Sequence, residues 1–138
     1  MHSYTERANE KVKNIMSKKK LLIIMSNSDP ANPEECYAPL FQATVAAALS
    51  HDVEVVFTGI TGQLAIAGVA EKVEINLESH RTIYDIIQEA YGAGVSFKAC
   101  NTSLEMAGKE LIAELDEKVG AAYVVGEAMD NNTITFTY

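Results

Sequence analysis

The chain has 138 residues, of which 48% are hydrophobic and 22% charged, as expected for one globular domain. Its net charge of −8 argues against binding to nucleic acid or to an anionic membrane surface, because both need a basic face. No apolar run approaches the roughly 18 residues of a membrane span. Two cysteines are too few for a disulfide framework, and no CxxC or CxxH pair suggests a metal site. We therefore expect a cytoplasmic protein with no membrane, nucleic-acid or metal partner.

The first 17 residues are polar but carry apolar side chains at helical spacing, namely Tyr4, Ala8, Val12, Ile15 and Met16. This spacing predicts an amphipathic helix that precedes the first strand. We therefore divide the chain into an N-terminal helical extension, residues 1–17, and a single α/β domain, residues 18–138. The extension could pack on the sheet, on a neighbouring subunit or on neither.

The first βα unit begins with a continuous apolar run at residues 21–25, which predicts a strand covered on both faces. A loop rich in turn residues follows, and Pro33 with two acids after it predicts the start of a helix. Pro39 lies inside this helix and removes one of its hydrogen bonds, so the helix should either bend or restart there. Residues 53–57 predict the second strand.

The region after the second strand is less regular. Residues 63–70 are small and apolar, as in a short helix packed closely on the sheet, and residues 73–78 alternate like an edge strand or a connector. Thr82 is suited to be the N-cap of a helix over residues 83–91. Because the chain lacks a GxGxxG or P-loop pattern, and the first loop has no glycine, we expect no nucleotide or other cofactor.

Residues 95–99 predict a buried strand that runs directly into Cys100. Thr102 and Glu105 then form the pattern of a capping box at the start of the next helix. Cys100 would lie beside the first N–H groups of that helix, which favour negative charge and so lower the pKa of a thiol. Cysteines in such positions are candidates for chemistry.

The three residues that directly follow Cys100 are Asn101, Thr102 and Ser103. They could donate N–H and hydroxyl hydrogen bonds to an anionic sulfur on Cys100. Lys98 shares a face with Cys100 only if the strand continues that far. The alternative is that Cys100 is a small apolar filler, since cysteine is among the most buried residue types.

The second thiol, Cys36, lies at the first βα junction, which is topologically equivalent to the position of Cys100. The two cysteines could act as a pair, but we favour a buried and inert Cys36. His51 and His80 flank helices and are expected on the surface, although either could approach Cys100 as a base.

We expect the helix after Cys100 to run to Leu115, interrupted near Gly108. Its acids should line a solvated face: Glu110, Glu114, Asp116 and Glu117. Residues 121–125 predict a fourth strand, and residues 133–138 a last one. The alternation of strands and helices predicts a three-layer α/β/α sandwich around a mostly parallel sheet of about five strands.

Four features combine with this order of elements: the Ser-Asn-Ser-Asp-Pro loop after the first strand, Gly59 after the second, residues 95–103, and residues 120–126 with the closing strand. Together they resemble the DsrE/DsrF-like sulfur-relay family over about residues 20–138. Cys100 stands at the position of the cysteine that carries sulfur in that family, whereas Cys36 matches no position of its motifs.

The resemblance implies a sulfurtransferase or sulfur carrier of a cytoplasmic relay, which holds sulfur as a persulfide on Cys100 and passes it to a partner thiol. It also implies sulfur donor and acceptor proteins as partners, and assembly into trimers or hexamers. Some members lack the cysteine and are structural subunits. Two alternatives therefore stay open: a non-catalytic oligomeric subunit, and a small-ligand binding module at the carboxyl edge of the sheet.

Overall fold

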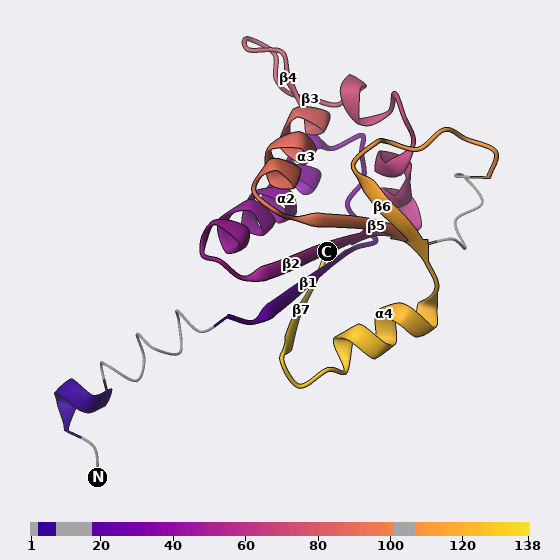
Figure 1. The fold of residues 1–138 in the computed structure, drawn as a ribbon. Helices are drawn as coiled ribbons and strands as arrows, with labels where there is room; N and C mark the ends of the chain where they lie inside the picture. The colour runs from indigo at the N-terminus through magenta and orange to yellow at the C-terminus, as the bar shows by residue number, and fades with distance from the viewer. Residues whose placement is uncertain (1–2, 8–17, 101–106) are drawn as a thin grey trace.

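In the computed structural model, which describes residues 3–7, 18–100 and 107–138, a five-stranded sheet runs through the centre of the fold (Figure 1). Its strands are β1 (Lys20–Met25), β2 (Asp52–Phe57), β5 (Ser96–Cys100), β6 (Leu115–Val119) and β7 (Thr133–Thr137). They lie in the order β6-β5-β2-β1-β7, and every neighbouring pair is parallel. The predicted α/β fold with a parallel sheet of about five strands is confirmed.

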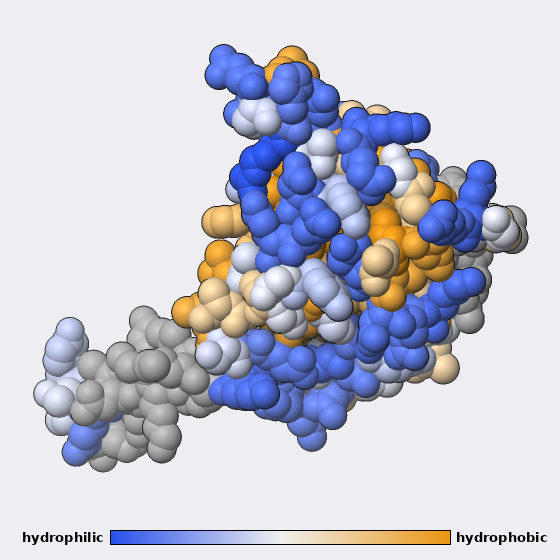
Figure 2. Space-filling model, turned by 45° about the horizontal axis from the view of Figure 1, so that its top comes forward, coloured by the Kyte–Doolittle hydropathy of each residue, from blue (hydrophilic) through white to orange (hydrophobic). Residues whose placement is uncertain are grey.

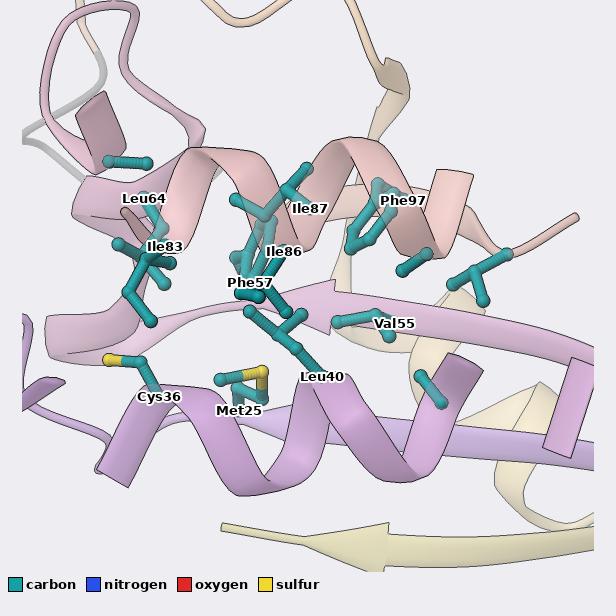
Figure 3. Close-up of a cluster of buried hydrophobic side chains, with 14 of the residues drawn as sticks. Met25, Cys36, Leu40, Val55, Phe57, Leu64, Ile83, Ile86, Ile87 and Phe97 are labelled. Atoms are coloured by element: carbon teal, nitrogen blue, oxygen red, sulfur yellow. The ribbon is translucent and has the colours of Figure 1, made fainter. Parts of the chain in front are cut away.

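Helices cover both faces of the sheet and complete the three layers. Helices α2 (Pro33–Ala48) and α3 (Ile83–Gly92) lie on one face, and α4 (Ala121–Ala128) lies on the other (Figure 1). The main core fills the space between the sheet and the pair α2 and α3 (Figure 3). The rings of Phe57 and Phe97 stack there, with their centroids 5.6 Å apart. Beneath α4 the buried cluster is much smaller and consists of Leu22, Val56 and Val119.

Both predicted helices of the main core are present. α2 starts at Pro33 with two acids in its first turn and continues through Pro39 to its end, so the helix does not restart. α3 has the expected N-cap, since the backbone N–H of Asp85 donates to Thr82 Oγ1 and the N–H of Thr82 donates to the Asp85 carboxylate.

Between β2 and α3 the chain forms two short 3₁₀ helices, η1 (Gly59–Ala65) and η2 (Ala70–Lys72), and a small hairpin. The hairpin pairs β3 (Glu74–Asn76) with β4 (Arg81–Thr82) and projects from the body (Figure 1). The segment predicted as an edge strand or connector therefore pairs locally and does not join the main sheet.

The predicted helix running to Leu115 is wrong over its described part. From residue 107 to 114 the chain turns, and Leu111 forms an isolated antiparallel bridge with Ile66. Gly108 has a φ of +68°, outside the helical region. Leu115 begins β6, whose polar sequence suits an edge strand with solvent beside it. Two of the acids assigned to a helix face, Asp116 and Glu117, thus belong to a strand.

The predicted strand at residues 121–125 is also wrong, because these residues open α4. Periodicity does not separate a short apolar run in a strand from one in a helix. The helix starts directly after Gly120, which has extended backbone angles, and continues three residues past the predicted strand. The last predicted strand is confirmed as β7.

Of the N-terminal extension, the structure describes residues 3–7. They form a helical turn whose start carries a capping box, since the N–H of Glu6 donates to Ser3 Oγ and the N–H of Ser3 donates to the Glu6 carboxylate. The remainder of the predicted amphipathic helix lies outside the described residues. In the described part of the chain, no helix combines the length and apolarity that crossing a bilayer requires.

Candidate functional site

Cys100 is the last residue of β5, at the carboxyl edge of the sheet. Phe97 and Ala99 belong to the core beneath α2 and α3, so the alternation of a strand directs Cys100 to the opposite face, toward α4. The side chain is 8% exposed. Parallel sheets collect ligands and reactive groups at this edge, and the predicted position of Cys100 at the end of a buried strand is confirmed.

A small apolar pocket opens beside Cys100. Its volume is about 170 Å³, and besides Cys100 it is lined by Ile24, Val56 and Thr58 from the sheet side and by Ala121, Val124 and Val125 from α4. Pockets for organic ligands or cofactors commonly hold roughly 300–1,000 Å³, so this one has room for only a few heavy atoms. Its lining favours uncharged, polarisable groups over a phosphate or a sugar.

Among the described residues, the helix that starts beside this pocket is α4. Asn101, Thr102, Ser103 and Glu105, the predicted donors and capping residues, lie outside the described residues. Cys100 pairs in register with Val119, the last residue of β6, and α4 starts two residues later. The first N–H groups of a helix lack intrahelical acceptors and carry partial positive charge, so α4 offers them close to the thiol.

A partly buried polar cluster lies on the same face of the sheet, and we call it the Glu54 cluster. It consists of Lys20, Glu54, Lys98, Tyr123 and Glu127. Lys20 Nζ lies 2.8 Å from Glu54 Oε2 and 2.6 Å from Glu127 Oε2. Lys98 Nζ lies 3.1 Å from Glu54 Oε1 and donates to Tyr123 Oη at 2.7 Å. Tyr123 in turn donates to Glu54 Oε1 at 2.8 Å.

These contacts fix the protonation states of the cluster. Burial alone would raise the pKa of Glu54, but hydrogen bonds from Lys20, Tyr123 and Lys98 outweigh it and lower that pKa. Burial alone would lower the pKa of Lys98, yet its bonds to Tyr123 and Glu54 raise it above its ordinary value. The pKa of Lys20 is raised in the same way, by Glu127 and Glu54. All three side chains therefore stay charged near pH 7.

The sequence analysis missed this cluster except for Lys98, which shares a face with Cys100 because β5 does continue that far. One signal was available, since Glu54 is a charged residue inside the otherwise apolar strand predicted at residues 53–57. A charge in that position needs a partner. Tyr123 gave no signal, because its segment was assigned to a strand.

Cys36 lies on the other side of the sheet from Cys100. It comes from the first turn of α2, is fully buried, and packs in the main core near Met25 (Figure 3). Its thiol donates to the carbonyl oxygens of Ser28 and Asp29, at 3.9 and 3.6 Å. Burial and the neighbouring acids raise its pKa to about 12. The structure thus places the two thiols in different layers.

We expect Cys36 in the native protein to be alkylated by iodoacetamide at about pH 8 at least roughly 100-fold more slowly than in the urea-unfolded chain, because a buried thiol with a raised pKa offers almost no thiolate. Peptide mapping by mass spectrometry after timed quenching measures the rate at each cysteine separately. Equal rates for Cys36 in the native and unfolded chains would contradict this assignment.

His51 and His80 are not among the described residues that line the Cys100 pocket. His51 precedes β2, at the amino edge of the sheet, where its Nδ1 accepts a hydrogen bond from the backbone N–H of Lys19. His80 lies exposed in the projecting hairpin, 3.8 Å from Glu74. Within residues 3–7, 18–100 and 107–138, no three His, Cys, Asp or Glu side chains are grouped to hold a metal ion.

Comparisons with known proteins give one family and one fold. The model of the DsrE/DsrF-like family matches residues 19–122. A comparison with curated protein sequences finds no match. Among solved structures, the fold is similar to the crystal structure of the ychN protein from E. coli, with a TM-score of 0.66 and 15% sequence identity. That match covers 87% of this chain and 100% of the ychN chain.

Proposed function

Because the chain belongs to the DsrE/DsrF-like family, we propose that it is a sulfur-relay protein that carries sulfane sulfur as a persulfide on Cys100. The observation that carries the proposal is the place of this cysteine. It ends a central strand at the carboxyl edge of the sheet and borders a small pocket next to the start of a helix. These are surroundings in which a thiolate can be both stabilised and reached.

The transfer needs only thiol chemistry and is redox-neutral. The thiolate of Cys100 attacks the outer sulfur of a donor persulfide, a new S–S bond forms on Cys100, and the donor's own S–S bond breaks to release its thiolate. In the second step an acceptor thiolate attacks the outer sulfur on Cys100, and the thiolate of Cys100 is restored. The proposed partners are therefore a sulfur donor protein and an acceptor protein. Asn101, Thr102 and Ser103 are proposed to support the anionic sulfur.

The apolar pocket suits this cargo. A second sulfur atom on Cys100 is small and polarisable, and it fits within about 170 Å³ beside Val56 and Val124. An apolar lining also keeps water and dissolved oxidants away from a group that oxidises readily. The chemistry depends on reduced thiols, so the proposal places the protein in the cytoplasm.

Persulfide loading tests the proposal directly. Incubation with a cysteine desulfurase and cysteine, or with thiosulfate, should add about 32 Da, one sulfur atom, to the peptide that contains Cys100, and dithiothreitol should remove it. Cys36→Ser should load normally and Cys100→Ser should not load. Failure of the wild-type protein to load with either donor, or equal loading of Cys100→Ser, would defeat the proposal.

A second candidate is a non-catalytic subunit of the same family, and the low exposure of Cys100 favours it. A subunit of this kind acts by binding other subunits through its surface.

Large apolar side chains are exposed on and directly after α2, at Phe41, Val45 and Leu49, and on edge strand β7, at Ile134 and Phe136. Figure 2 shows apolar patches among hydrophilic side chains near the end of α2. Under either candidate we propose a homo-oligomer, a trimer or hexamer, which light scattering measures.

A further inference from the structure

We infer that α4 is a movable wall of the Cys100 pocket, and that Glu54 holds this wall against the sheet and so sets the access to Cys100. The inference rests on the proposed function in taking Cys100 as the reacting group. The contacts that carry it belong to α4 and the sheet, and they do not depend on sulfur transfer.

The sheet and α4 line opposite sides of the pocket beside Cys100. Its floor comes from the sheet and the residue after β2, and its opposite side comes from Ala121, Val124 and Val125 of α4. A shift of α4 relative to the sheet therefore changes the opening above Cys100. The same shift leaves the main core on the other face in place.

Apolar packing holds α4 only weakly. None of its residues is buried, Val125 is 60% exposed, and Met129 directly after the helix is 77% exposed. By contrast, α3 buries four apolar residues against the main core, Ile83, Ile86, Ile87 and Ala90. The hydroxyl of Thr135, on the strand face beneath α4, is buried and makes no hydrogen bond within the described part of the chain. The layer between α4 and the sheet is thus thinly packed, and one buried hydroxyl in its described part lacks a hydrogen bond.

Polar contacts attach both ends of α4 to one residue. Tyr123 in the first turn donates directly to Glu54, and Glu127 in the last turn reaches Glu54 through Lys20, which lies within 2.8 Å of both carboxylates. The Glu54 side chain is 4% exposed, and hydrogen bonds to a buried charge are stronger than those in water. Glu54 is therefore the common anchor of a helix that has little other hold.

Tyr123→Phe tests the inference, because it keeps the ring beneath Lys98 Nζ and removes the hydroxyl that donates to Glu54 and accepts from Lys98. In the 138-residue protein, without any sulfur donor, we expect the variant to raise the rate of Cys100 labelling by a bulky maleimide at least about fivefold, because it removes two hydrogen bonds between α4 and the sheet, each worth about that factor against opening. A small reagent, iodoacetamide, should be affected less. Glu127→Gln, at the other end of α4, should shift the rates in the same direction.

Two controls make the result specific. Tyr84→Phe removes a tyrosine hydroxyl that donates to the Glu114 carboxylate at 2.9 Å, away from α4, and should leave the labelling of Cys100 unchanged. Cys36, buried in the main core, reports on general unfolding in the same sample and should stay unlabelled in every variant.

The inference is overturned if Tyr123→Phe and Glu127→Gln both label Cys100 at the wild-type rate, or if Cys36 becomes labelled in parallel with Cys100. A protein that fails to load persulfide but shows this labelling pattern would reject the proposed function and keep the movable wall. A protein that loads persulfide on Cys100 but labels at the wild-type rate in both variants would keep the proposed function and reject the movable wall.

Discussion

Glu54→Gln is expected to lower the free energy of unfolding near pH 7 by about 3 kcal/mol, because it removes the buried counter-charge that two largely buried lysines share. Lys20 and Lys98 both contact the Glu54 carboxylate within 3.1 Å. The other acids paired with them in the described residues, Glu127 and Glu117, are 31% and 56% exposed. Urea unfolding followed by circular dichroism measures the difference. Replacing a surface acid gives the matched control: Glu89→Gln breaks an exposed ion pair with Arg81 and should cost less than about 1 kcal/mol.

The pH dependence of this loss has a defined sign. The pKa of Glu54 is lowered in the folded state, so its contribution is present above the unfolded pKa of roughly 4.3 and disappears as the pH falls through the folded value. The stability gap between the wild-type protein and Glu54→Gln should therefore narrow steadily in acid. A gap of constant size from neutral pH into strong acid would show that the charge of Glu54 is not what stabilises the fold.

Gly59→Ala is expected to destabilise the protein by about 2–4 kcal/mol, because a side chain does not fit there. Gly59 follows β2 with a φ of +52°, and a Cβ atom would lie 2.5 Å from the carbonyl oxygen of Ser26. That carbonyl already accepts a hydrogen bond from the N–H of Ile60 at 3.2 Å. Relief of the clash would have to move the loop after β1 away from the carboxyl edge, where Thr58 borders the Cys100 pocket.

Gly126→Ala is the matched control for this substitution. Gly126 lies inside α4, and a Cβ atom there would meet nothing within 4 Å. Alanine is the better helix former, so this variant should gain roughly 0.5–1 kcal/mol. Thermal unfolding of both variants under the same conditions measures the contrast. Equal stability of Gly59→Ala and the wild-type protein would contradict the close approach at Ser26.

The three central strands, β1, β2 and β5, could be predicted because each is mainly apolar, as expected for strands covered on both faces. Only β1 is a continuous apolar run, since β2 and β5 carry the buried charges Glu54 and Lys98. β6 and α4 were misassigned for opposite reasons. β6 lies at an edge of the sheet and is mostly polar, so it lacks that signature, whereas α4 carries a short apolar run that suits either a strand or a helix. In both segments tertiary position decided the structure.

The candidate site divides in the same way. The place of Cys100 follows from local sequence, because a buried strand ends at that residue. The Glu54 cluster does not follow from local sequence, since Tyr123 and Glu54 are separated by 69 positions. They meet only because α4 covers the face of the sheet toward which the Glu54 side chain of β2 is directed. Sequence alone gives the charged residue in the strand but not the side chains that bind it.

The separation of Cys36 and Cys100 by the sheet has a kinetic consequence. These are the only two cysteines of the chain, and a disulfide between them would need their Cα atoms within about 7 Å, on the same side of the sheet. Cys36 therefore cannot act as a resolving thiol for Cys100 of the same chain. Under the proposed function, sulfur carried on Cys100 leaves by attack of a thiol other than Cys36, so at low acceptor concentration the rate of discharge rises in proportion to the concentration of the acceptor.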